Sequence, residues 1–199
     1  ALRDMVQSHL LQMLTLVAME PPPSLDAEAL RDEKVKVLRS IRPIALSAVH
    51  AHAFRAQYAR GRIGNERVVS YLEEPDVPAN STTETYVALK LLIDNWRWRH
   101  VPFFLRTGKR MAQSTSQISI RFKHPPQQLF RETQIKQLEP NWLLMGIQPS
   151  EFLRLEVQVK QQGLEMVAET QRLDAAVRGQ APFDIDAYEA LLLDVIDGG

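Results

Sequence analysis

Cysteine is absent from the 199 residues, which excludes disulfides, thiolate nucleophiles and cysteine-ligated metal centres. An excess of charge is absent too, because 24 Lys and Arg residues balance 24 Asp and Glu residues. Zero net charge argues against a nucleic-acid-binding protein, which usually carries a basic surface. No apolar run reaches the roughly 18 residues of a membrane-spanning helix. We therefore expect no nucleic acid and no membrane as partner, and an intracellular location.

A glycine-rich phosphate loop is also missing, since no GxGxxG motif occurs anywhere in the chain. The sequence shows no internal repeat. Its 45% hydrophobic and 24% charged residues are ordinary for a globular protein. A chain of this length can bury about 70% of its unfolded surface without disulfides or metals. The sequence therefore predicts a self-sufficient core and no cofactor-binding residues for a dinucleotide.

Helical patterns occupy the two ends of the chain. Residues 3–20 contain strong helix formers without a breaker and end at three prolines. Ser24 is placed to cap a second helix over residues 25–41, which carries one apolar stripe. Asp184 can cap a last helix that Gly198 ends.

Between these helices the apolar period changes from 3.6 to 2, which is typical of strands. Residues 48–58 alternate and are predicted to form a strand. Val87, Leu89, Leu91 and Ile93 fall on one face of another. Further strands are expected around residues 101–106, 117–123, 142–147, 153–160 and 164–173. The pattern predicts one α+β domain over residues 1–199, built on a large, mainly antiparallel sheet with helices on one face.

His9, on the first helix, is the first candidate for chemistry. It is either a structural histidine at the edge of the core, with hydrogen-bond partners for its ring nitrogens, or a proton acceptor near neutral pH. A histidine base needs a carboxylate to orient its ring, and Asp4 lies five residues earlier. In an α-helix that spacing is about 140° of rotation and about 7.5 Å of rise. Asp4 is therefore not expected to be the orienting carboxylate.

Two other groups have structural interpretations beside the chemical ones. His50 and His52 would share a strand face, yet two imidazoles without a third ligand are weak evidence for a metal, and none is predicted. Residues 96–99, Trp-Arg-Trp-Arg, could stack on nucleic-acid bases. With zero net charge, cation–π packing at a strand end is the favoured interpretation.

The segment 106–110, Arg-Thr-Gly-Lys-Arg, places three cations around Gly108 at the end of an alternating stretch. Glycine permits close approach of a ligand to the backbone. The segment is thus either an anion site or a solvated turn.

Six stretches of the chain carry a resemblance to a known enzyme family. They are RDMVQSHLLQMLTLVAMEPP, RDEKVKVLRSIRPI, YLEEPDVPANSTTETYVALKLLIDNWRWRHVPFFLRTGKRM, LFRET, IQPSE and DAYEALLLDVIDG. In this order, along nearly the whole chain, they resemble glucose-6-phosphate dehydrogenase. The chain resembles the C-terminal domain of that family, without the N-terminal Rossmann domain.

This resemblance implies an activity and a set of site residues. The family oxidises glucose 6-phosphate at C1 to the lactone and passes hydride to NADP, in the pentose phosphate pathway. His9 stands where the family has its catalytic base. Asp4, Lys109 and Gln148 match positions that contact or lie near the substrate. The resemblance also implies a cytoplasmic enzyme and a homodimer, or a dimer of dimers, formed through the sheet.

The sequence also departs from the family pattern. The RIDHYLGKE segment is absent, and with it the main phosphate-binding residues and the aspartate that orients the base. Ser8 replaces a usual asparagine, and the basic residues of a structural NADP site are not evident. The chain is expected to be truncated at both ends and inactive alone. The alternative is a free-standing, non-catalytic oligomerisation or protein-binding module, but retention of His9, Asp4 and Lys109 favours an enzyme.

Overall fold

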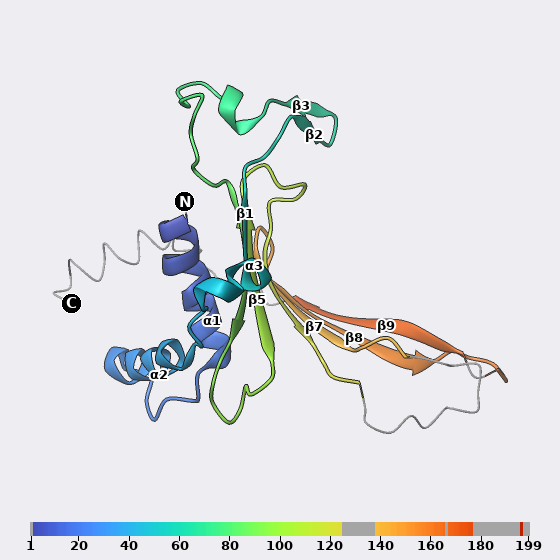
Figure 1. Ribbon diagram of the computed structural model, residues 1–199. Helices are drawn as coiled ribbons and strands as arrows, with labels where there is room; N and C mark the ends of the chain where they lie inside the picture. Colours follow the sequence, from blue (N-terminus) through green and yellow to red (C-terminus); the bar gives the residue numbers. More distant parts are fainter. Residues whose placement is uncertain (1, 125–137, 166, 177–195, 197–199) are drawn as a thin grey trace. The chain divides into compact units, whose positions relative to one another are not determined.

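The computed structural model describes residues 2–124, 138–165, 167–176 and 196 (Figure 1). The chain divides into two compact units, residues 1–112 and 113–199. The helices of the first unit are η1 (Leu2–Leu10), α1 (Leu11–Ala18), α2 (Ala27–Ser40), η2 (Leu46–Ala48), α3 (Val49–His52) and η3 (Tyr71–Glu73). Its strands are β1 (Ala53–Ala56), β2 (Gly61–Ile63), β3 (Glu66–Val68), β4 (Tyr86–Leu92) and β5 (Pro102–Gly108). The second unit contains β6 (Ser116–Arg121), β7 (Trp142–Gln148), β8 (Phe152–Lys160) and β9 (Ala168–Ala176).

All strand pairing in the described residues is antiparallel, so the predicted α+β class is confirmed. The strands are distributed over three sheets, with orders β1-β4-β5, β2-β3 and β6-β7-β8-β9. None of the helices described here is long and apolar enough to cross a membrane. The last helix, expected from Asp184, lies outside the described residues.

The core of the first unit lies between one face of β1-β4-β5 and the helices α1 and α2. Alternation on β4 turns Val87 and Leu91 inward, and Ile93 just beyond the strand is 1% exposed. The predicted inward face of this strand is therefore confirmed. The helices contribute Leu14 and Ala18 of α1 and Val37 of α2 to the same cluster. Helices thus cover one face of this sheet, as expected.

Two local predictions were wrong. Asp26, not Ser24, caps α2, because its Oδ1 accepts a hydrogen bond of 2.8 Å from the backbone N–H of Ala29. That bond is also the main reason why the pKa of Asp26 is lowered. Residues 48–58 are not one strand, since the helix α3 (Val49–His52) precedes the short β1. Alanine, which alternates with histidine in residues 50–53, is the strongest helix former. The alternation with period 2 therefore predicted a longer strand than the chain forms.

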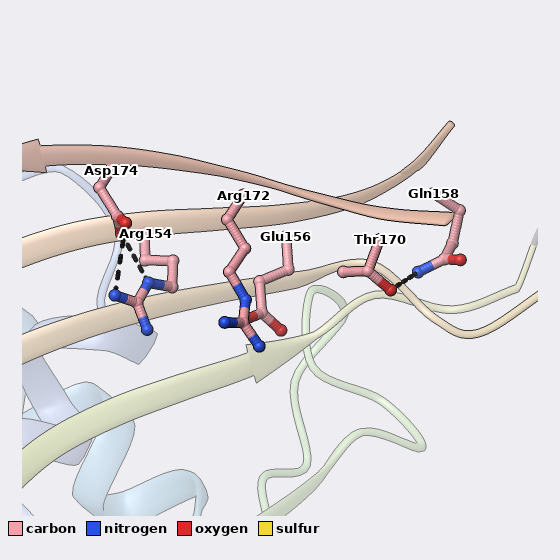
Figure 2. Close-up of polar contacts among 6 residues, drawn as sticks. All are labelled: Arg154, Glu156, Gln158, Thr170, Arg172 and Asp174. Carbon is pink, nitrogen blue, oxygen red and sulfur yellow. Dashed lines mark hydrogen bonds and ion pairs between the residues drawn. The ribbon is translucent and has the colours of Figure 1, made fainter. Parts of the chain in front are cut away.

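The described strands of the second unit form one antiparallel sheet with two chemically different faces. On β8 and β9, opposed side chains on one face are complementary (Figure 2). The three pairs are Arg154 with Asp174 (2.6 Å), Arg172 with Glu156 (3.1 Å) and Gln158 with Thr170 (2.8 Å). The intervening residues Leu153, Leu155 and Val157 lie on the other face. A slip of one residue would exchange the two faces, so this pattern specifies the register.

Candidate functional site

The first helix begins with a π-helical segment, η1, which changes the relation between Asp4 and His9. The distance from Asp4 Oδ1 to His9 Nε2 is 3.7 Å. The expected separation of Asp4 and His9 assumed 3.6 residues per turn, which does not hold in this segment. A contact of this length does not contradict the expectation that Asp4 is not the orienting carboxylate. A π-helix closes its turn between residues i and i+5, which is the spacing of this pair. Because 3.7 Å exceeds hydrogen-bond length, the two side chains lie within ion-pair distance but do not form a hydrogen bond.

Both side chains of this pair face solvent, at 60% exposed for His9 and 71% for Asp4. Val6, between them in sequence, is 6% exposed and fixes the inner side of the same segment. An exposed ion pair contributes little to stability, because solvent screens it. The pair is therefore accessible to a ligand. Its small contribution to the stability of the fold does not explain why these two residues are present.

The other end of the same helix is tied to the segment before β5. The indole Nε1 of Trp98 donates a 2.9 Å hydrogen bond to the carbonyl of Ala18. The Arg97 guanidinium lies 5.1 Å from the Trp98 ring centroid, which confirms the cation–π interpretation of this motif. At its N-terminal end, η1 contacts β5. The π-helical segment that carries His9 is therefore in contact with β5, the strand that Lys109 directly follows.

The three cations at the end of β5 do not converge. Arg106 is exposed on the strand face opposite to Leu105, which is buried in the core. Arg110 Nη2 donates a 2.9 Å hydrogen bond to Glu74 Oε1 and is neutralised by it. Lys109 is exposed, and no carboxylate among the described residues pairs with it. Arg106 and Lys109 are thus the two exposed cations of this segment that have no carboxylate partner among the described residues.

Gly108 has a different role from the expected one. A Cβ atom at Gly108 would lie 2.7 Å from Tyr86 Cδ2 and 3.1 Å from Met111 Sδ. Tyr86 is the residue directly opposite on β4. The space that glycine leaves is therefore filled by an aromatic ring of the protein itself, and the interpretation of Gly108 as an opening for a ligand was wrong.

Gln148 ends β7 in the second unit and is exposed. It lies opposite Ser116 of β6 and precedes Pro149. The structure thus brings Asp4 and His9 together, with Lys109 in the same unit, whereas Gln148 belongs to the other unit.

Sequence reasoning missed Tyr58 and Glu74. The Tyr58 hydroxyl donates to the same Glu74 Oε1 as Arg110, at 2.9 Å. The hydrogen bond from Arg110, followed by that from Tyr58, lowers the pKa of Glu74. Burial, followed by the hydrogen bond to Glu74, raises the pKa of Tyr58. No spacing rule links these residues, and the turn pattern of residues 74–81 was the only signal.

Neither a metal nor a cofactor has an evident site in the part of the chain that the structure describes. No cluster of three His, Asp or Glu residues there could hold a metal ion. One cavity of about 410 Å³ lies on the β2–β3 hairpin between Arg60, Arg62 and Arg67. A second cavity, of about 240 Å³, is lined by residues that include Arg42, Lys90 and Pro102. Neither His9 nor Lys109 lines either cavity, so we place the candidate site by its chemistry and not by these cavities.

Comparison with known proteins identifies the family. Residues 1–199 match the family model described as "Glucose-6-phosphate dehydrogenase, C-terminal domain". The chain is 42% identical to glucose-6-phosphate 1-dehydrogenase of Dickeya dadantii and 47% identical to that of Rhizobium meliloti. These alignments cover 99% and 98% of this chain, but only 41% and 40% of the relatives' own lengths.

Solved structures agree with this assignment. One, glucose-6-phosphate dehydrogenase in complex with its substrate glucose-6-phosphate, matches 98% of this chain with a TM-score of 0.82 and 36% identity. Glucose-6-phosphate 1-dehydrogenase from Mycobacterium avium matches 96% with a TM-score of 0.77 and 38% identity. The chain spans 38% and 37% of those two structures. The chain therefore belongs to the glucose-6-phosphate dehydrogenase family, in the region of its C-terminal domain.

Proposed function

We propose that this chain is the C-terminal, substrate-binding part of an NADP-dependent glucose-6-phosphate 1-dehydrogenase. The observation that supports this most is the likeness, over 98% of the chain, to a dehydrogenase solved with glucose 6-phosphate. In this proposal both units act as one C-terminal domain of a cytoplasmic enzyme of the pentose phosphate pathway.

His9 is proposed to remove the proton of the C1 hydroxyl. As the C1–H bond breaks, its electron pair leaves as hydride and the C1–O bond becomes the carbonyl of 6-phosphogluconolactone. The proton passes to the imidazole, a base suited to neutral pH. NADP, held by sequence outside this chain, supplies the hydride acceptor. Asp4, Lys109 and Gln148 are proposed to hold the sugar phosphate, and the exposure of all three allows that contact.

An activity comparison tests this proposal. The intact enzyme should form NADPH from glucose 6-phosphate, and the purified 199-residue chain should form none, because its described part has no site for the acceptor. The measurement is absorbance at a wavelength specific to NADPH, with and without sugar phosphate. Turnover by the chain alone would contradict the proposed division of roles. An intact protein without this activity would favour a non-catalytic module.

We further propose that the chain forms a homodimer, or a dimer of dimers, through its sheets. Every fully buried residue in the described part of the chain lies in the first unit. In the second unit Leu153 and Leu173 are 39% and 56% exposed, and on the outer face of β1-β4-β5 Phe54 and Phe104 are 62% and 73% exposed. A sheet with an apolar face is stable when a second layer covers that face. A second copy of the chain would supply such a layer.

Sedimentation equilibrium tests this association. We expect dimers or larger species at protein concentrations of tens of micromolar, on the order of the dissociation constant of a weak interface. Leu173→Lys places a charge on the exposed apolar face of β9 and should shift the equilibrium toward monomer. Leu46→Lys, the same change at a leucine that is 92% exposed on η2 and outside the sheets, is the matched control and should leave the equilibrium unchanged. Only monomer at these concentrations would count against the proposal.

A further inference from the structure

The backbone at Lys109 is fixed by a hydrogen bond to a buried neighbour. The N–H of Lys109 donates a 2.8 Å bond to the carbonyl of Thr85, which is 7% exposed. Thr85 is itself held on two sides. Its hydroxyl accepts from the N–H of Tyr58 at 2.9 Å, and its own N–H donates to the carbonyl of Ala56 at 2.9 Å. The chain is therefore anchored where Lys109 begins, and this anchoring leaves the side chain free.

Immediately after Lys109 the chain turns through an unfavourable conformation. Arg110 has φ 55°, in the left-handed region, where a residue with a side chain is strained. Such a conformation persists only when the surroundings hold it. The 2.9 Å hydrogen bond from Arg110 Nη2 to Glu74 Oε1 is the contact that holds this side chain. Glu74 lies 36 residues earlier in the chain, on the loop that follows η3.

Glu74 is in turn held in place and kept ionised. Its Oε1 accepts from the Tyr58 hydroxyl as well as from Arg110, and its side chain is only 21% exposed. The Arg110 guanidinium lowers the pKa of Glu74, so the carboxylate stays charged well below neutral pH. It therefore pairs with Arg110, while no carboxylate among the described residues pairs with the adjacent Lys109.

We propose that Glu74 is a positioning residue that, by holding Arg110, fixes the turn from which Lys109 meets the substrate. This inference rests on the proposed role of Lys109 in binding the sugar phosphate. Tyr58 serves the same purpose one step further away, because it holds the Glu74 carboxylate.

The test compares Glu74→Gln with Glu73→Gln in the intact enzyme. Glu74→Gln removes the charge that holds Arg110 and should raise KM for glucose 6-phosphate about threefold to tenfold, the range for losing a partly exposed pair that orients a binding group. We expect kcat and KM for NADP to stay within about twofold. Glu73 is the matched control, because it is adjacent but pairs with Arg60 instead. Glu73→Gln should leave KM unchanged.

Repeating the change in a Lys109→Thr background separates positioning from general loop stability. There, Glu74→Gln should give no further rise in KM, since the group that it positions is gone. Arg110→Met, which removes the pair from the other side, should reproduce the effect of Glu74→Gln.

The possible outcomes divide clearly. An equal rise in KM in both backgrounds, or none in the presence of Lys109, overturns the positioning role of Glu74. If Lys109→Thr itself leaves KM unchanged, the proposed substrate contact of Lys109 fails, and this inference fails with it. A raised KM in Lys109→Thr with an unchanged KM in Glu74→Gln overturns this inference alone.

Discussion

Replacing His9 by asparagine in the intact enzyme should lower kcat by about 100- to 10,000-fold, the usual contribution of a positioned acid–base group. Asparagine keeps a polar side chain of similar reach, but it cannot accept the proton of the C1 hydroxyl at neutral pH. The loss falls on the transition state, because the proton moves only during hydride transfer. The helix itself should be unaffected, since the His9 side chain is 60% exposed.

His50→Asn is the matched control for this change. His50 is exposed on α3 in the same unit, and no role in the site is proposed for it. Steady-state kinetics at saturating NADP should show a normal kcat for His50→Asn. If His9→Asn also turns over within a few-fold of the unmodified enzyme, His9 is a structural histidine at the edge of the core.

Replacing Lys109 by threonine should act on binding instead. A charge-assisted hydrogen bond to a phosphate or sugar oxygen contributes roughly 1.5–3 kcal/mol. Its loss corresponds to a dissociation constant for glucose 6-phosphate that is about tenfold to a hundredfold weaker. The turn should survive, because its anchors are the backbone N–H of Lys109 and the pair between Arg110 and Glu74.

Lys90→Thr controls for the loss of a positive charge from the same sheet. Lys90 lies on β4, opposite Phe104, near the far end of the strand pair from Lys109. Titration calorimetry should give an unchanged dissociation constant for Lys90→Thr. An unchanged constant for Lys109→Thr would leave the end of β5 as a solvated turn.

The fold was predictable from the sequence wherever burial imposed a strong period. Val87, Leu91 and Ile93 alternate because one face of β4 packs on helices, and this face was predicted correctly. The prediction failed where local chemistry had close competitors. Both Ser24 and Asp26 can cap a helix. Which of the two does so depends on the path that the chain takes after the three prolines. Similarly, the alternating Ala and His of residues 48–52 fit a short helix as well as a strand.

The sequence could single out residues for the candidate site, but it could not predict their geometry. The sequence marked His9 and Lys109, yet hydrophobic spacing does not distinguish a π-helix from an α-helix, so the approach of Asp4 to His9 was missed. The bond between Glu74 and Arg110 spans 36 residues. Such a contact depends on the tertiary fold, and an ion pair has no sequence period that could reveal it.

In the proposed enzyme His9 supplies chemistry, while other residues of this chain supply binding. The most direct test is the dissociation constant of glucose 6-phosphate for intact His9→Asn enzyme, measured by titration calorimetry on protein whose kcat has fallen. We expect a constant within about threefold of that of the unmodified enzyme, because a proton acceptor contributes little to ground-state affinity. Binding weakened as much as turnover would contradict it, since His9 would then hold the substrate rather than take its proton.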